Sequence, residues 1–245
     1  MHRLYYPKEN ISGDYIAVDA AERAHYLSGV LRLRPKENLM VFDGEGMEYL
    51  CEIEKAASRI IDLKIKEKRQ VKRITPQVAI ACAVPKKSKM DDIIDKLTQL
   101  GVNSIIPMLT ERVNVEWDQQ QRQKHIARWR KIAISACEQS GRAYLPFIEE
   151  IKDFKTVIAK SKDFDLKLIP NLIDKKIAFK DAFAAHRHHN ILVLIGPEGD
   201  FTPEEVRFAL DNGFQAVSLG DSVLRVETAA VAAVSYIRLY NEENS

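Results

Sequence analysis

Residues 191–213 read ILVLIGPEGDFTPEEVRFALDNG, a stretch that predicts a strand, a tight turn and a helix in succession. The five opening apolar residues show no polar alternation, which is typical of a strand buried on both faces. Thr202 is the expected N-cap, with Pro203 at the first helical position and Glu205 completing a capping box. Gly213 ends the helix. A glycine-bearing turn between a buried strand and a helix N-terminus is a common ligand cradle in open α/β sheets.

Similar apolar runs recur on both sides of this stretch. They predict further buried strands at 78–84, 104–109, 166–169 and 216–219. Helices are expected between and after these strands, one beginning at Ser88 and closed by Gly101, one at 120–139, and one beginning near Glu227. This alternation predicts an α/β domain around a mainly parallel sheet.

The first 70 or so residues follow a different pattern, which predicts a small β-rich module. The segments 39–42 and 48–55 flank the turn DGEG at 43–46 and predict a hairpin. Residues 59–68 alternate between apolar and charged, as a half-buried strand does. A short helix is expected at 24–31. Few strands close most naturally into a compact barrel, and the boundary is expected at the basic stretch before Pro76.

Composition narrows the class of protein. The chain has 245 residues, of which 46% are hydrophobic and 29% charged, so a folded core is expected. The longest apolar run is strand-sized, which predicts no membrane span. Three scattered cysteines predict neither a disulfide framework nor a metal site, and they favour the reducing cytoplasm. The net charge is only +2, but basic residues cluster between Lys64 and Arg73, as a solvated face or a phosphate-binding surface requires.

Two segments carry the candidate chemistry. The turn GPEGD at 196–200 fits neither the dinucleotide nor the nucleoside triphosphate loop, and its acids disfavour a phosphate. It is either a plain tight turn or a cradle for a neutral or cationic ligand with hydroxyls. The second segment, 218–240, contains Arg225 and Glu227 at the start of an apolar helix. Either these two form an ion pair that caps the helix, or Arg225 faces a substrate.

The segments IGPEGDFTPEEV at 195–206 and LGDSVLRVETAAVAA at 219–233 closely resemble the RsmE family of SPOUT-class RNA methyltransferases. The similarity continues in order through 26–34, 84–102, 109–113 and 131–142, so it spans nearly the whole chain. One departure is Asp200, which stands where many relatives carry a second glycine.

The resemblance implies a PUA-like RNA-binding β-barrel at 1–72 and a SPOUT methyltransferase domain at 73–245, with a trefoil knot and a homodimer. It implies S-adenosylmethionine as cofactor, N3 of a uridine in 16S ribosomal RNA of the small subunit as target, and a cytoplasmic location. No metal is implied. The implied cofactor-binding residues are Leu168, Pro170, Asn171, Ile195, Gly196, Pro197, Glu198, Gly199, Leu219, Gly220, Leu224, Glu227, Thr228 and Ala229. The RNA-binding candidates are Arg32, Arg34, Lys86, Lys89, Arg112 and Arg142.

Uridine N3 carries a proton that must leave before the atom can attack a methyl group. We expect Arg225 to stabilise charge on the uracil oxygens, and Glu198 or Glu138 to take the proton. Two other interpretations stay open, namely a non-catalytic RNA-binding or ribosome-assembly protein and a methyltransferase that acts on another RNA.

Overall fold

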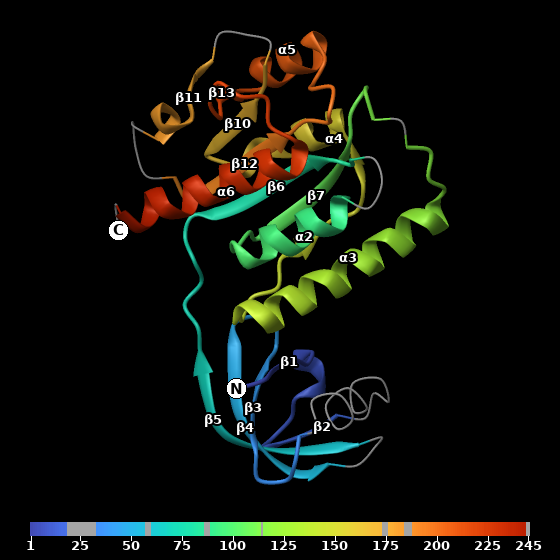
Figure 1. Cartoon of the computed structure of the whole chain (residues 1–245), viewed down its shortest axis with the longest axis vertical. Helices are drawn as coiled ribbons and strands as arrows, with labels where there is room; N and C mark the ends of the chain where they lie inside the picture. Colours follow the sequence, from blue (N-terminus) through green and yellow to red (C-terminus); the bar gives the residue numbers. More distant parts are fainter. Residues whose placement is uncertain are drawn as a thin grey trace. The chain divides into compact units, whose positions relative to one another are not determined.

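The computed structural model describes residues 1–18, 33–56, 60–85, 89–113, 115–172, 176–183 and 188–243. The chain folds into two compact units (Figure 1). The N-terminal unit contains residues 1–73 and 137–145, and the C-terminal unit contains residues 74–136 and 146–245. The predicted helix at 24–31, the helix start at Ser88, and the RNA-binding candidates Arg32 and Lys86 lie outside the described residues.

The N-terminal unit is built on a curved sheet. Its described strands are β1 (Arg3–Tyr5), β2 (Tyr15–Val18), β3 (Asn38–Phe42), β4 (Met47–Ala56) and β5 (Ile61–Gln70), in the order β1-β3-β4-β5-β2. A short 3₁₀ helix, η1 (Lys8–Asn10), follows β1. β3, β4 and β5 form an antiparallel meander, and β1 pairs with β3 in parallel.

The predicted hairpin and the predicted alternating strand are both confirmed. In the turn between β3 and β4, the buried Asp43 carboxylate accepts hydrogen bonds from the amides of Glu45 and Met47. Along β5, Ile61, Leu63 and Ile65 are buried and join the core of this unit. Period-two burial therefore fixes which face of β5 points inward.

Residues 137–145 belong to the N-terminal unit, although the sequence analysis assigns them to the C-terminal domain. The amide of Gly46 donates to the carbonyl of Ala143, and the amide of Leu145 donates to that of Gly44. The Tyr144 hydroxyl donates to the carbonyl of Val71. The segment 137–145 therefore forms hydrogen bonds with the β3–β4 turn, which is far away in sequence.

The C-terminal unit contains a parallel sheet. In the described part of the chain its strands are β6 (Gln77–Ala83), β7 (Ser104–Leu109), β8 (Phe147–Ile148), β9 (Lys152–Asp153), β10 (Leu166–Pro170), β11 (Ile177–Ala178), β12 (Asn190–Ile195) and β13 (Gln215–Ser218). The order is β11-β13-β10-β12-β6-β7-β8, with β9 also paired to β7, and each of these pairs is parallel. The predicted strands are confirmed.

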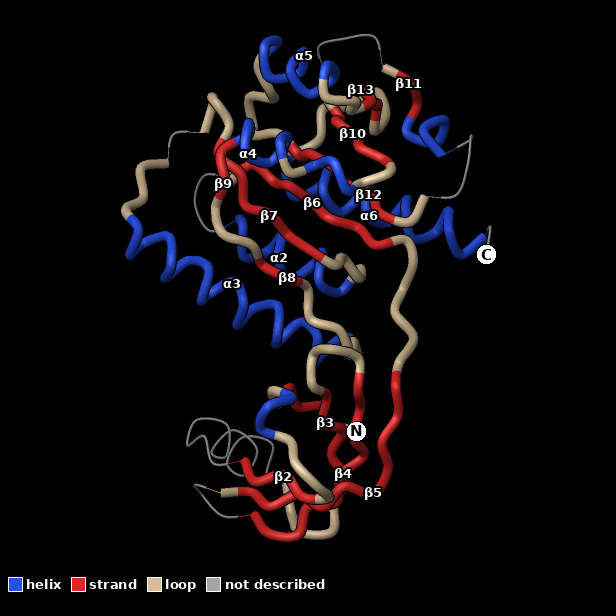
Figure 2. Tube along the Cα trace, turned by 180° about the vertical axis from the view of Figure 1, so that it is seen from behind, coloured by secondary structure: helices blue, strands red, loops and turns tan. Residues whose placement is uncertain are grey.

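Helices cover both faces of this sheet (Figures 1 and 2). α2 (Lys89–Gln99), α3 (Gln119–Ser140), η4 (Phe179–Phe183) and α6 (Val226–Glu243) contribute to one core. α4 (Phe154–Ala159) and α5 (Pro203–Asp211) contribute to the core on the opposite face, and η3 (Ser161–Asp163) follows α4. Such two-sided cover explains why the strands are apolar on both faces.

The prediction for α5 is confirmed in detail. The Thr202 side chain accepts from the amide of Glu205, and the Glu205 carboxylate accepts from the amide of Thr202. α6 begins at Val226, next to the predicted start. Among the described helices, none has the length and apolar character needed to cross a membrane. The trefoil knot implied by the resemblance stays a prediction.

Candidate functional site

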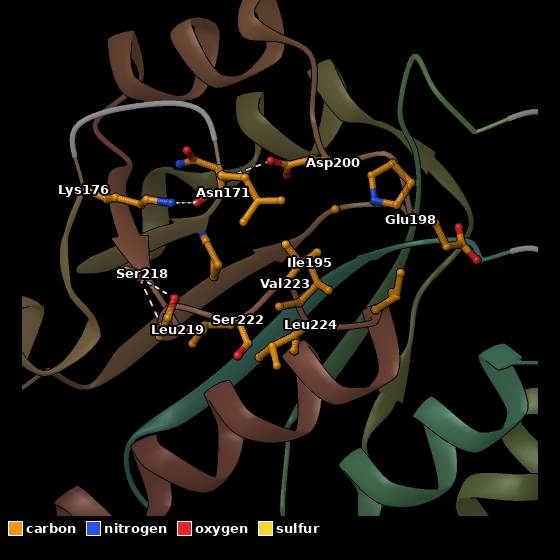
Figure 3. Close-up of a pocket in the computed structure, with 17 residues that line it drawn as sticks. Asn171, Lys176, Ile195, Glu198, Asp200, Ser218, Leu219, Ser222, Val223 and Leu224 are labelled. Atoms are coloured by element: carbon orange, nitrogen blue, oxygen red, sulfur yellow. Dashed lines mark hydrogen bonds between the residues drawn. The ribbon is translucent and has the colours of Figure 1, made fainter.

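A cleft open to solvent lies at the carboxyl ends of β10, β12 and β13, within the C-terminal unit (Figure 3). The turn after β10, the loop between β12 and α5, and the loop between β13 and α6 form its walls. About 620 Å³ between these walls is free of protein atoms, a volume that includes the open solvent at the mouth. The residues around it are Pro170, Asn171, Leu172, Lys176, Ile195, Gly196, Pro197, Glu198, Asp200, Ser218, Leu219, Gly220, Ser222, Val223, Leu224, Val226 and Ala229.

Most of the predicted cofactor-binding residues come together in this cleft. Those that line it are Pro170, Asn171, Ile195, Gly196, Pro197, Glu198, Leu219, Gly220, Leu224 and Ala229. The other four do not line it. Leu168 is fully buried in β10, Gly199 lies in the β12–α5 loop, and Glu227 and Thr228 lie in the first turn of α6.

Seven lining residues were missed by the sequence analysis, namely Leu172, Lys176, Asp200, Ser218, Ser222, Val223 and Val226. Ser222 and Val223 lie in the loop between β13 and α6, inside the candidate segment 218–240. Ser218 stabilises that loop, because its hydroxyl accepts from the amide of Gly220 at 3.2 Å. Gly220 has a φ of +119°, which favours glycine. No sequence motif marks Lys176, because none of the segments that carry the family resemblance lies between residues 143 and 190.

Asp200 joins two walls of the cleft. Its carboxylate accepts from the amide of Leu172 at 2.7 Å (Figure 3). It also accepts from the amide of Phe201 at 2.8 Å. Lys176 supports the same turn, because its ammonium donates to the carbonyl of Asn171 at 3.0 Å. The backbone of Asp200 has a φ of +60°, where side chains are disfavoured and glycine is not. A glycine would adopt this φ without a Cβ penalty.

Arg112 supports the β12–α5 loop from the segment after β7. Its guanidinium donates to the carbonyl of Gly199 and lies 3.5 Å from that of Asp200. The neighbouring Glu111 accepts from the hydroxyl of Thr202 at 3.1 Å, and its amide donates to Glu205 at 2.9 Å. The segment after β7 therefore holds the cleft loop and the start of α5 together. The predicted contact of Arg112 with RNA stays a prediction.

A group of three charges lies beside the cleft. The Lys89 ammonium is 3.7 Å from Glu198 and 3.9 Å from Glu227. Burial raises the pKa of the Cys82 thiol to about 12, and the negative charges of Glu198 and Glu227 act in the same direction. The alternative of an Arg225–Glu227 ion pair is wrong, because the structure places Lys89 against Glu227 and leaves Arg225 exposed.

The remaining predicted residues lie elsewhere. Glu138 is part of the N-terminal unit, where its carboxylate accepts from the amide of Tyr5 at 3.0 Å. Arg142 is half-buried in the same unit, and burial lowers the pKa of its guanidinium. Arg34 is exposed. In the part of the chain that the structure describes, His, Cys, Asp and Glu form no group of three that could hold a metal ion.

Comparison with known proteins places the chain in a family. A model described as RNA methyltransferase domain matches residues 72–238, and one described as RNA methyltransferase PUA domain matches residues 18–66. The chain is an RNA methyltransferase family member. Among curated members, ribosomal RNA small subunit methyltransferase E of Bacillus subtilis is 30% identical over 90% of this chain and 89% of its own length. That of Rickettsia conorii is 30% identical over 97% and 95%, respectively.

Solved RNA methyltransferase structures have the same fold. Ribosomal RNA small subunit methyltransferase E from Neisseria gonorrhoeae, bound to S-adenosyl methionine, has a TM-score of 0.88 and 31% identity, over 98% of both chains. A methyltransferase from Legionella pneumophila, in complex with the bound cofactor SAM, has the same score and identity over 97% of both. This family member therefore combines the PUA and methyltransferase domains of its relatives in one chain.

Proposed function

We propose that this RNA methyltransferase uses S-adenosylmethionine to methylate N3 of a uridine in 16S ribosomal RNA. The observation that carries the proposal is the cleft, in which three turns distant in sequence meet at one edge of a parallel sheet. Family membership and the cofactor named for the two solved relatives support it.

The residues present fit this cofactor. Its adenine and the carbon chain of its methionine part need apolar contact, and Ile195, Leu219 and Leu224 line the cleft. Its cationic sulfonium needs negative charge, which Glu198 supplies at the rim. Gly196 also packs closely against the core, because a Cβ there would be only 3.0 Å from the buried Phe201 ring. Main-chain amides and carbonyls of the three turns are available to read polar ligand edges.

When bound, S-adenosylmethionine supplies an electrophilic methyl group carried on a sulfonium. The chain has to orient the uracil ring toward that methyl and receive the N3 proton. Glu198 lines the cleft with 39% of its side chain exposed, so it is the better placed proton acceptor of the two predicted acids. Glu138 already accepts from a backbone amide. Arg225 directly precedes α6 beside the cleft loop and is free to meet a uracil oxygen.

RNA contact is assigned to the N-terminal unit and to Arg34, with the other predicted arginines and lysines as further candidates. Exposed basic residues of β5 offer phosphate contacts, although several are already paired. Lys66 lies 3.1 Å from Glu52, and Arg69 lies 2.6 Å from the buried Glu48. Ion pairing with acids lowers the charge that this face can offer to phosphates.

Two further parts of the proposal come from the family resemblance. We assign a homodimer, supported by the exposed Leu239 and the half-buried Val231 and Ala232 on α6. Sedimentation analysis of the purified chain tests it, and a monomer at micromolar concentration contradicts it. Because ribosomal RNA is the proposed substrate, the activity is placed in the cytoplasm.

The test combines binding and turnover. Purified protein is titrated with S-adenosylmethionine in a calorimeter, then incubated with the cofactor and either small ribosomal subunits or naked 16S RNA. Mass spectrometry of digested RNA should detect 3-methyluridine in one of the two. Cofactor binding without any methylated uridine contradicts the substrate, and absence of cofactor binding supports the non-catalytic RNA-binding alternative. In an Arg225→Ala variant we expect unchanged cofactor affinity and slower methylation.

A further inference from the structure

The charge group of Lys89, Glu198 and Glu227 has one positive and two negative members, so its formal net charge is −1. These residues come from separate elements: Lys89 begins α2, Glu198 lies in the β12–α5 loop, and Glu227 lies in the first turn of α6. Glu198 is at one end of the cleft, and Lys176 is at the other (Figure 3). The excess negative charge therefore sits at a defined end of the proposed cofactor site.

The negative charge of Glu227 is poorly compensated. Its Oε2 is buried and makes no hydrogen bond to the described residues, and the Lys89 ammonium is beyond hydrogen-bond distance at 3.9 Å. The side chain is 18% exposed, so water screens it less than a surface carboxylate. The start of α6 adds a favourable partial positive charge, which explains why the site tolerates the carboxylate. Because one lysine cannot neutralise two carboxylates, negative charge remains to attract another cation.

The proposed reaction changes the charge of the ligand in the cleft. Transfer breaks the bond between sulfur and the methyl carbon and forms the bond between that carbon and uracil N3, which gives up its proton. The sulfonium becomes a neutral thioether, and the positive charge leaves as the proton. Substrate and by-product thus differ by one unit of charge and one methyl group.

From this charge difference we infer that the group of Lys89, Glu198 and Glu227 makes the cleft select the cationic methyl donor over the neutral S-adenosylhomocysteine. The inference rests on the proposed function. It assigns the three side chains a role in cofactor specificity and in release of the spent cofactor, which loses its electrostatic attraction when the methyl group leaves. Lys89, predicted as an RNA contact, acts here as the member that limits the negative charge.

Two substitutions should move the selectivity in opposite directions. Glu227→Gln removes one negative charge and does not touch the cleft lining, because Glu227 is not among the lining residues. We expect the affinity ratio of S-adenosylmethionine to S-adenosylhomocysteine to fall about fivefold, equal to about 1 kcal/mol at 1.4 kcal/mol per tenfold. Lys89→Gln removes the positive charge, and the ratio should rise by about the same factor.

The measurement is calorimetric titration of each variant with both ligands, without RNA. Glu204→Gln and Lys131→Gln are matched controls, because both residues are exposed in the C-terminal unit and lie outside the cleft lining. Their ratios should equal that of the unaltered chain. A packing defect weakens both ligands together and leaves the ratio unchanged, so opposite shifts report charge.

An unchanged ratio in Glu227→Gln and Lys89→Gln, or a shift in the same direction in both, overturns the inference. If the unaltered chain binds neither ligand, the proposed function fails instead, so the two failures are distinguishable.

Discussion

Replacing Asp200 with alanine removes both hydrogen bonds of its carboxylate while leaving the backbone at a φ of +60°. A hydrogen bond to a charged group contributes about 1.5–3 kcal/mol net. An alanine in the left-handed region costs a further ~1 kcal/mol. Of the two hydrogen bonds, the one from the Leu172 amide joins the Asp200 loop to that turn, so we expect this link to lose about 2 kcal/mol. The loss acts locally, because both segments are loops at the rim of the cleft.

Hydrogen exchange at the Leu172 amide measures this loss directly. If the free energy of local opening falls by about 2 kcal/mol, that amide exchanges about 30-fold faster. The cleft then spends less time in its closed form, so we expect the dissociation constant of S-adenosylmethionine to rise about tenfold. Amides in the β12 strand should exchange as before, because the strand lies in the sheet.

Two further variants separate the hydrogen bonds from the backbone strain. Asp200→Asn keeps an acceptor for the Leu172 amide and tolerates a positive φ, so it should stay within about threefold of the unaltered affinity. Asp200→Gly relieves the backbone strain but loses both acceptors, so its affinity for S-adenosylmethionine should lie between those of Asp200→Ala and Asp200→Asn. Asp211→Ala, at the exposed end of α5, controls for loss of charge. If Leu172 exchanges equally fast in Asp200→Ala and in the unaltered chain, the linking role is refuted.

Three other outcomes follow from the structure. Gly196→Ala places a methyl group 3.0 Å from the fully buried ring of Phe201, so thermal unfolding should show a loss of about 1–3 kcal/mol. Burial raises the pKa of Cys82 from 9.0 to about 12, so the native thiol should not react with a disulfide reagent at pH 8 and should react after unfolding. The contribution of the protonated Cys82 thiol to the free energy of unfolding is complete below about pH 9 and is lost as the pH rises toward 12. Denaturation of the unaltered chain and of Cys82→Ala at several pH values measures this loss. RNA affinity should fall steeply with salt in a filter-binding assay, and a flat response would contradict phosphate contact.

Local sequence predicts the elements of this fold well because the relevant forces are local. The capping box at Thr202 and Glu205 involves residues three apart, so composition and spacing are sufficient to place the start of α5. The buried strands are recognisable because helices cover both faces of the sheet and exclude polar side chains. The same reasoning gives the alternating face of β5.

Contacts between distant residues are not predictable from such patterns. Continuity with α3 predicts that residues 137–145 belong to the C-terminal domain, whereas their hydrogen bonds go to the β3–β4 turn, about 100 residues earlier. Closeness in sequence likewise suggests Arg225 as a partner for Glu227. Instead, Glu227 lies against Lys89 at the start of α2, which is 138 positions earlier in the sequence. Pairing of charges depends on which helix ends meet, and no local signal encodes that.

Parallel pairing explains why one edge of the sheet holds everything the proposed chemistry needs. Since β10, β12 and β13 run in the same direction, the turns that follow them must leave the sheet at one edge, whatever their separation in sequence. β6 lies beside β12, so the start of α2 and its Lys89 arrive at that edge as well. Backbone groups of three turns and three charged side chains thus converge there without any shared motif. A change of strand order would separate them, so no single motif predicts the cleft.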